Sequence, residues 1–320
     1  MLILADVPME DPRRRLSRSP LPGWRPAAQT RASPPHQAKN GLDGDPGVWA
    51  YVYIGRGGIV MLIWGDVLGV VMMSREMALR VMEESLAARE RVAALEWGHI
   101  LHELDAQGNA VLDRLLTRGE CTALAALYRD DSVFRSRVVM ASHGFGRGEY
   151  KYFRYPLPEI VADLRTELYP RLAPIANGWN AAMNIAIRYP ETHEAFLRRC
   201  HSAGQKKPTP LLLEYEEGDF NCLHQDLYGE HVFPIQVAIL LSEPGKDFTG
   251  GEFVLTEQRP RMQSRAEVVG LRQGDGVAFA VHHRPVKGTR GTYRVNMRHG
   301  VSRLRSGKRH TLGIIFHDAQ

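Results

Sequence analysis

The sequence predicts an α+β protein in which N-terminal helices pack on the sheet of a double-stranded β-helix (jelly roll). Segments with helical periodicity are gathered between residues 74 and 204, and short alternating segments follow one another after Pro208. Gly-rich turns separate the later segments at the spacing typical of a double-sheet jelly roll. Hydrophobic residues make up 44% of the 320 residues and charged residues 24%, which is ordinary for a protein with a buried core. Helices grouped before strands favour helices on the outside of one sheet structure.

Composition divides the chain into three regions. Residues 1–73 form a disordered or non-native N-terminal extension, because the first 50 residues are rich in Pro, Arg, Gly and Ser and have no periodicity. Residues 74–204 are a helical region that supports the core, and residues 205–320 are the jelly-roll domain. A competing hypothesis for the extension is that the native start is one of four later methionines, Met72, Met73, Met77 or Met82.

The apolar run at 51–73 is long enough to suggest a membrane span, but Arg56, Asp66 and five glycines within it argue against one. The first residues do not form a signal peptide, because acidic residues precede the arginines and no apolar segment follows. We therefore expect no membrane association. The three cysteines are far apart and form no metal or disulfide pattern, which favours a reducing cytoplasm: Cys121, Cys200 and Cys222. Cys222 is close to a candidate ligand, but we expect it only to pack in the strand or pocket.

A capping residue and strong helix formers indicate a helix near 74–97. Further helices are expected near 118–128, 157–172 and 192–201, with a short strand and turn near 109–116. The later strands are expected near 210–217, 222–226, 233–242, 251–257, 265–270, 276–282, 292–300 and 309–316.

His224 and Asp226 are the first candidate functional pair. They follow a segment in which Leu211, Leu213 and Tyr215 share one strand face, and their i, i+2 spacing places both side chains on one face as well. A second imidazole from a distant strand would complete two histidines and one carboxylate, a set that leaves three open positions on Fe(II). His-x-Asp alone is common, so the pair needs this further ligand before it indicates a metal site.

His299 is our candidate for that ligand. Alternation before it places Val295 and Met297 on the same face as His299, so its side chain points with the apolar ones. Five other histidines compete for the role: His231, His282, His283, His310 and His317. We expect His282 and His283 to lie at the rim of the site.

Arg309 lies ten positions after His299, on the next alternating strand. If the face that carries Arg309, Thr311 and Gly313 lines a pocket, the arginine can hold the far carboxylate of a dicarboxylic keto acid in a bidentate fork.

Together these residues resemble the 2-oxoglutarate- and Fe(II)-dependent dioxygenases of the prolyl-hydroxylase-like type. The similarity extends over about 205–320 and is weaker over 95–204. Within the superfamily it is greatest to a bacterial group known only as 2OG-Fe(II) oxygenases. The matching motifs are His224-Gln225-Asp226, Gly250-Gly251-Glu252-Phe253, His299-Gly300-Val301 and Gly307-Lys308-Arg309-His310-Thr311-Leu312.

The resemblance implies His224, Asp226 and His299 as iron ligands, and Arg309, Tyr215 and Thr311 as residues that bind 2-oxoglutarate. It implies Fe(II), 2-oxoglutarate and O2 as cofactor and cosubstrates, with ascorbate as an optional reductant. The reaction it implies is hydroxylation of a C–H bond, with release of succinate and CO2.

Three functions follow, in order of preference. The first is a hydroxylase of a protein side chain, an amino acid or a small metabolite. The second is an alkylation-repair-like demethylase of nucleic acid, suggested by ten Lys and Arg residues after Leu271 against two Asp. Such charge is more often a solvated face, so nucleic acid is the less favoured partner. The third is a jelly-roll binding protein without activity. The sequence leaves the substrate and the oligomeric state open.

Overall fold

A computed structural model describes residues 50–54, 60–64, 67–71, 88–227, 229–289 and 291–320. Its contacts divide the chain into two units, Met1–Glu84 and Ser85–Gln320. In the first unit β1 (Ala50–Ile54), β2 (Val60–Trp64) and β3 (Val67–Val71) form an antiparallel sheet. The apolar run thus contains strands, and no helix among the described residues is long and apolar enough to cross a membrane. The expected disorder of the first residues and the part of the expected 74–97 helix before residue 88 lie outside the described residues. The described part of that helix ends at Ala94, and a second helix begins at Trp97.

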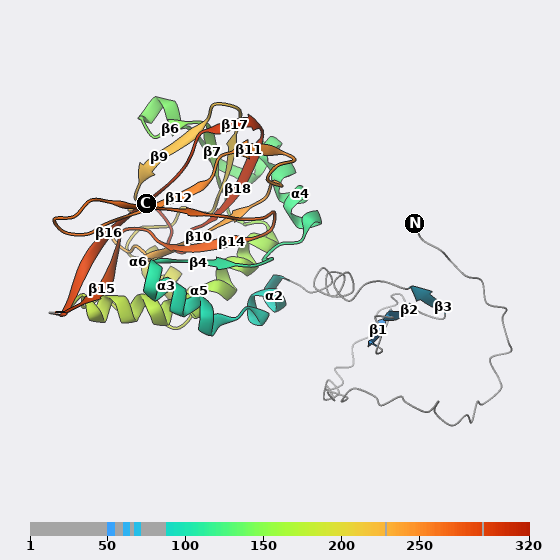
Figure 1. Cartoon of the computed structure of the whole chain (residues 1–320), viewed down its shortest axis with the longest axis horizontal. Helices are drawn as coiled ribbons and strands as arrows, with labels where there is room; N and C mark the ends of the chain where they lie inside the picture. The colour runs from blue at the N-terminus through green and yellow to red at the C-terminus, as the bar shows by residue number, and fades with distance from the viewer. Residues whose placement is uncertain (1–49, 55–59, 65–66, 72–87, 228, 290) are drawn as a thin grey trace, which may run out of the picture. The chain divides into compact units, whose positions relative to one another are not determined.

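The second unit contains five α-helices among the described residues (Figure 1), which are α2 (Ala88–Ala94), α3 (Trp97–Gln107), α4 (Arg118–Ala126), α5 (Glu159–Ala182) and α6 (His193–Ser202). Three short 3-10 turns lie at Leu127–Arg129, Asp131–Val133 and Met140–His143. The strands are β4 (Asn109–Leu112), β5 (Phe134–Val139), β6 (Gly146–Arg147), β7 (Glu149–Phe153), β8 (Leu211–Tyr215), β9 (Phe220–His224), β10 (Ile235–Leu240), β11 (Phe248–Gly250), β12 (Phe253–Gln258), β13 (Arg265–Val269), β14 (Gly276–Ala280), β15 (His283–Gly288), β16 (Gly291–Val301), β17 (Leu304–Gly307) and β18 (Arg309–Ile314).

These strands form two large antiparallel sheets. One has seven strands in the order β4-β14-β10-β18-β8-β7-β5. The other has six, of which five follow the order β13-β12-β16-β9-β6 and the sixth, β15, pairs with β16. A small pair, β11 and β17, completes the set. The fold is thus a mixture of helices and antiparallel sheet. Because β4, β5 and β7 share a sheet with β8, β10, β14 and β18, strands from both sides of the predicted boundary at 204/205 belong to one structure.

Local sequence explains most helix limits. Thr117 and Glu120 form a capping box that starts α4, and the Thr192 side chain caps α6. Helix α5 is the exception, because it runs ten residues beyond its predicted end at 172 and passes Pro170 and Pro174. Its buried residues recur at helical spacing to Trp179, so burial of one face maintains the helix where local propensity would end it.

Alternation along the central strands places the core on one side of the seven-stranded sheet. Ile239, Leu312 and Ile314 are fully buried and belong to the same hydrophobic cluster as Leu168 and Leu172 of α5. Figure 1 shows α3 and α5 together on one side of this unit, away from β9 and β17. Residues at the intervening positions of β10 and β18 point the other way and are free to line a cavity.

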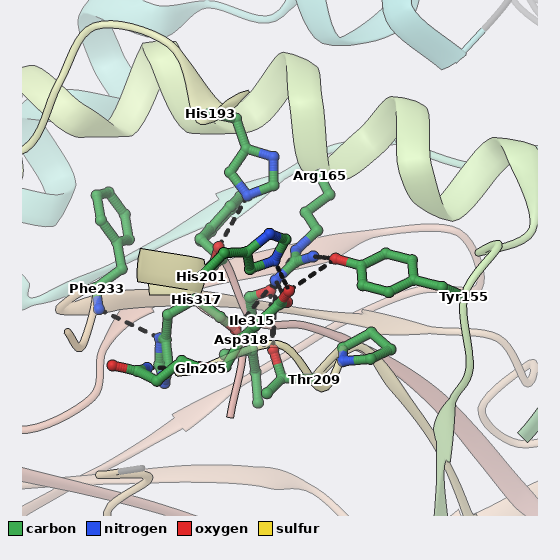
Figure 2. Close-up of polar contacts among 12 residues, drawn as sticks. Tyr155, Arg165, His193, His201, Gln205, Thr209, Phe233, Ile315, His317 and Asp318 are labelled. Carbon is green, nitrogen blue, oxygen red and sulfur yellow. Dashed lines mark hydrogen bonds and ion pairs between the residues drawn. The ribbon is translucent and has the colours of Figure 1, made fainter. Parts of the chain in front are cut away.

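Hydrogen bonds and a buried ion pair connect the residues that follow β18 to the helices (Figure 2). Arg165 of α5 forms an ion pair with Asp318, with 2.7 Å between Nη2 and Oδ1. The guanidinium also donates to the carbonyls of Ile315 and His317. Tyr155 Oη donates to Asp318 Oδ2 at 2.9 Å, and His201 Nε2 lies 2.7 Å from the same oxygen. The ion pair is shielded from water, since the side chain of Arg165 is 2% exposed and that of Asp318 is 0% exposed.

Candidate metal centre

The structure brings His224, Asp226 and His299 together at one point. Their candidate ligand atoms all lie within 4.8 Å of one another. Asp226 stands between the two imidazoles, with Oδ1 3.4 Å from His224 Nε2 and Oδ2 3.5 Å from His299 Nε2. This is the arrangement of two histidines and one carboxylate that the sequence predicted, and nitrogen and oxygen donors of this kind suit Fe(II).

Backbone contacts select the ring nitrogen that His224 presents. Its Nδ1 lies 2.8 Å from the Cys222 carbonyl, so Nδ1 carries the proton and donates it there. When the ring is neutral, its lone pair is then on Nε2, the nitrogen that faces Asp226, which is the usual division of roles in a metal-binding histidine. Cys222 was expected to pack in the strand or pocket, but its side chain is exposed. It contributes its carbonyl instead.

A register shift between β9 and β16 sets the directions in which the two histidine side chains point. His299 pairs with His224, whereas Val301 pairs with Asn221, so three steps on β9 match two steps on β16. The extra residue on β9 is a β-bulge, which bends the strand and changes which way its side chains point. Asn221 and His224 would face opposite sides of a regular strand, yet both line the same cavity. Asp226 lies just beyond the end of β9.

Charge within the triad is arranged to receive a cation. Burial opposes ionisation of Asp226, but hydrogen bonds from His224 and His299 outweigh it and hold the pKa of the carboxyl well below its usual range. Burial lowers the pKa of His299, and this effect outweighs the attraction of Asp226. At His224 burial also lowers the pKa, but the hydrogen bond to Asp226 and its charge raise it by more. The site therefore offers an ionised carboxylate and a neutral imidazole at His299.

Arg309 is the second polar feature of the cavity. It is 2% exposed and pairs across β18 and β8 with Tyr215. Nη1 donates to Thr311 Oγ1 at 2.6 Å, while Nε has no partner. Among the described residues no carboxylate forms an ion pair with this guanidinium. A buried cation with unused donors is costly unless an anion joins it, so the residue fits a carboxylate ligand.

One cavity contains both features. Its volume is about 240 Å³, and its lining includes the three triad residues, Arg309, Thr311 and Tyr215. The Tyr215 hydroxyl is buried and has no hydrogen-bond partner among the described residues. As predicted, Leu211, Leu213 and Tyr215 share the face that lines the cavity. None of the competing histidines lines the cavity. The position of His282 and His283 at its rim stays a prediction.

Some lining residues were not found from the sequence. Tyr150 and Tyr152 belong to β7, whose alternating Glu149–Phe153 segment carried a strand signal that was not used. Phe279 of β14 packs against His299, with 4.6 Å between ring centroids. No local pattern marks Gln236, which also lines the cavity.

Gly251 supports the position of Arg309. Its φ is +66°, and a Cβ there would lie 2.5 Å from Leu304 Cδ1 and 3.1 Å from Arg309 Cδ. We expect Gly251→Ala to lower the free energy of unfolding by about 1–3 kcal/mol, because it adds steric overlap to backbone strain. Gly245→Ala is the matched control, since Gly245 has φ of +80° but open space around it. Equal losses for the two variants in thermal denaturation would show that packing at Gly251 is unimportant.

Comparisons with known proteins agree with this site. Residues 148–319 match a family described as "Oxygenase, catalysing oxidative methylation of damaged DNA". An uncharacterised protein of Mycobacterium tuberculosis is 49% identical over 193 residues, which are 59% of this chain and 83% of that protein. A Pseudomonas putida prolyl-4-hydroxylase structure is 15% identical with a TM-score of 0.43, covering 70% of this chain and 99% of its own. A 2OG-Fe(II) oxygenase family structure from Burkholderia pseudomallei is also 15% identical with a TM-score of 0.41, covering 70% and 92%.

The two solved structures are too distant to indicate a substrate. The family match covers more than half of the chain, and the mycobacterial relative is matched over most of its length. The non-enzymatic reading is therefore not supported. The resemblance drawn from the sequence is confirmed for the family, and the His-Asp-His triad is compatible with iron. This chain belongs to the oxygenase family that matches residues 148–319, and it is an oxidoreductase.

Proposed function

We propose that this chain is an Fe(II)- and 2-oxoglutarate-dependent oxygenase that removes a methyl group from a damaged nucleic-acid base by oxidation. One observation carries the cofactor assignment: the buried Arg309, without a carboxylate partner among the described residues, shares a cavity with His224, Asp226 and His299. A dicarboxylic keto acid has one end for a metal and one end for an arginine. The two antiparallel sheets around the cavity support the finer proposal of a double-stranded β-helix.

Each residue has a defined task in this proposal. His224, Asp226 and His299 hold Fe(II) and leave positions open for the keto acid and dioxygen. Arg309 holds the far carboxylate of 2-oxoglutarate, Thr311 orients the guanidinium through its hydroxyl, and Tyr215 donates its unpaired hydroxyl to the same carboxylate. Apolar residues of the lining, such as Leu213 and Phe253, keep water from the reacting groups.

The bound cofactors supply the oxidation. With both bound, decarboxylation of 2-oxoglutarate and oxidation of the methyl C–H bond would each give two electrons to O2, so that one oxygen atom would enter succinate and the other a new hydroxymethyl group. That group leaves nitrogen as formaldehyde, and the base regains its N–H.

The family description supports nucleic acid, the second of the three functions derived from the sequence, ahead of a protein or small-metabolite hydroxylase. The basic C-terminal segment adds little support. Arg284 is paired with Glu257, Lys308 contacts Glu214, and Arg309 belongs to the cavity. Three of the ten basic residues therefore already have a partner or a place in the cavity. The cytoplasmic location stays a prediction.

The proposal is tested with protein reconstituted with Fe(II) under anaerobic conditions and then exposed to oxygen. Single-stranded oligonucleotides that carry one N-methyladenine or one N-methylcytosine are compared with unmethylated strands. We expect a methylated strand to increase succinate formation and to release formaldehyde in equal amount. Succinate formation that none of the strands increases would contradict the proposed nucleic-acid substrate. Absence of both Fe(II) binding and succinate would contradict the enzyme.

Arg309→Lys tests the cosubstrate site. Lysine keeps the charge but loses the fork that binds a carboxylate through two parallel hydrogen bonds. We expect KM for 2-oxoglutarate to rise at least tenfold, because a charged bidentate contact contributes more than about 1.4 kcal/mol. The measurement is the dependence of succinate formation on 2-oxoglutarate concentration. Arg305→Lys is the control, since Arg305 is exposed. An unchanged KM in Arg309→Lys would remove Arg309 from the site.

A further inference from the structure

Gln236 is a buried polar side chain that the proposed chemistry does not use. It belongs to β10, is 4% exposed and lines the cavity that contains the triad. Its amide nitrogen has no hydrogen-bond partner among the described residues. A buried amide donor left unpaired is unfavourable, whereas leucine at the same place would pack without that penalty. The side chain is therefore suited to a ligand that enters the cavity.

The strand register places Gln236 away from the end of the cavity that holds Arg309. Val237 pairs with Ile314 on β18, so Gln236 lies opposite Ile315, six residues from Arg309. Six residues of extended strand span roughly 20 Å, which is much longer than a five-carbon dicarboxylate. The carboxylate that Arg309 holds is thus out of reach of the Gln236 amide.

Gln236 is nevertheless close to the metal centre. It pairs with Phe279 on the neighbouring strand β14, and the Phe279 ring packs on the ring of His299. The Gln236 side chain therefore lies at the end of the cavity that contains the triad. A group that is oxidised at the metal must come to this part of the cavity.

We propose that Gln236 is a substrate-recognition residue whose side-chain amide pairs with the polar edge of the base presented to the metal. A side-chain amide carries both a donor and an acceptor, so it can pair with an edge that offers the complementary groups, as glutamine does with adenine. This inference rests on the proposed function, because it names the residue that selects the base at the same site.

Two variants test the pairing. Gln236→Glu keeps the shape and removes the donor, and Gln236→Leu removes both polar groups. We expect each variant to raise KM for the methylated strand at least tenfold and to change KM for 2-oxoglutarate less than twofold. Gln258→Glu and Gln258→Leu are the matched controls, because Gln258 is an exposed glutamine of β12. Succinate and formaldehyde are both measured, with the N-methyladenine and N-methylcytosine strands assayed separately.

The outcomes separate this inference from the proposed function. If wild type demethylates a strand and both Gln236 variants keep its KM, the recognition role is wrong while the proposed function stands. If both KM values rise together, Gln236 supports the cavity as a whole and the role in recognition is again wrong. If no methylated strand stimulates wild type while succinate still forms, the nucleic-acid substrate fails, and the assignment of Gln236 to a base fails with it.

Discussion

His299→Ala is expected to abolish Fe(II) binding and, with it, formation of succinate from 2-oxoglutarate. His299 supplies one of three donors, and the remaining pair, His224 and Asp226, comes from positions i and i+2 of a single segment. Replacing a residue that only orients a metal ligand already lowers metal affinity or activity by about 10–100-fold. Loss of a ligand should therefore lower metal affinity and activity by more than 100-fold.

Metal binding and turnover are both needed for this test. Fe(II) retained after anaerobic dialysis is measured beside succinate formation, and circular dichroism checks that the variant is folded. His99→Ala is the control, because His99 is exposed on α3. A folded His299→Ala variant that retains Fe(II) and turns over 2-oxoglutarate would remove His299 from the metal centre and return the five competing histidines to consideration.

Asp318→Asn is expected to have the largest effect on stability. The substitution leaves the guanidinium of Arg165 buried without its carboxylate, and breaking a buried ion pair at one partner costs about 3–5 kcal/mol. Denaturant unfolding of the variant and of Asp113→Asn, an exposed control, measures the difference. A loss below 1 kcal/mol would mean that Arg165 is solvated in the variant.

The same pair predicts a dependence on pH. Burial opposes ionisation of Asp318, but the charge of Arg165 and the hydrogen bonds from His201 and Tyr155 lower its pKa in the folded protein. A carboxyl with a lowered pKa contributes stability that is complete above its unfolded pKa, about 3.9, and is lost as pH falls through the folded value. The difference in free energy of unfolding between wild type and Asp318→Asn should thus be constant above about pH 5 and should decrease below about pH 4. A stability difference that increases as the pH falls would contradict this prediction.

The sequence was sufficient where a residue's role follows from its own strand. Alternation placed Tyr215, His299 and Arg309 on inward faces, and all three line the cavity. The helices expected near 118–128 and 192–201 correspond to α4 and α6. These signals are local, so they are readable without knowledge of the neighbouring elements.

The sequence was insufficient where a role depends on a partner far along the chain. The bulge that turns His224 toward His299 is defined by pairing between β9 and β16, and one strand alone cannot reveal it. Gln236 looks like any glutamine in an apolar strand until β14 and β18 bury it. Helix α5 likewise continues past Pro170 because of what it packs against.

The position of β18 has a consequence for how the chain reaches this structure. It follows every other strand of the seven-stranded sheet in sequence, yet it lies in the middle, between β10 and β8. Until β18 is inserted, those two neighbours present unpaired edges, and an open edge is a template for association with other chains. Joining the halves of the sheet is a contact of long sequence separation, which makes it slow. A chain shortened before Arg309 would therefore lose its cosubstrate anchor and also keep two open edges, so we expect it to aggregate.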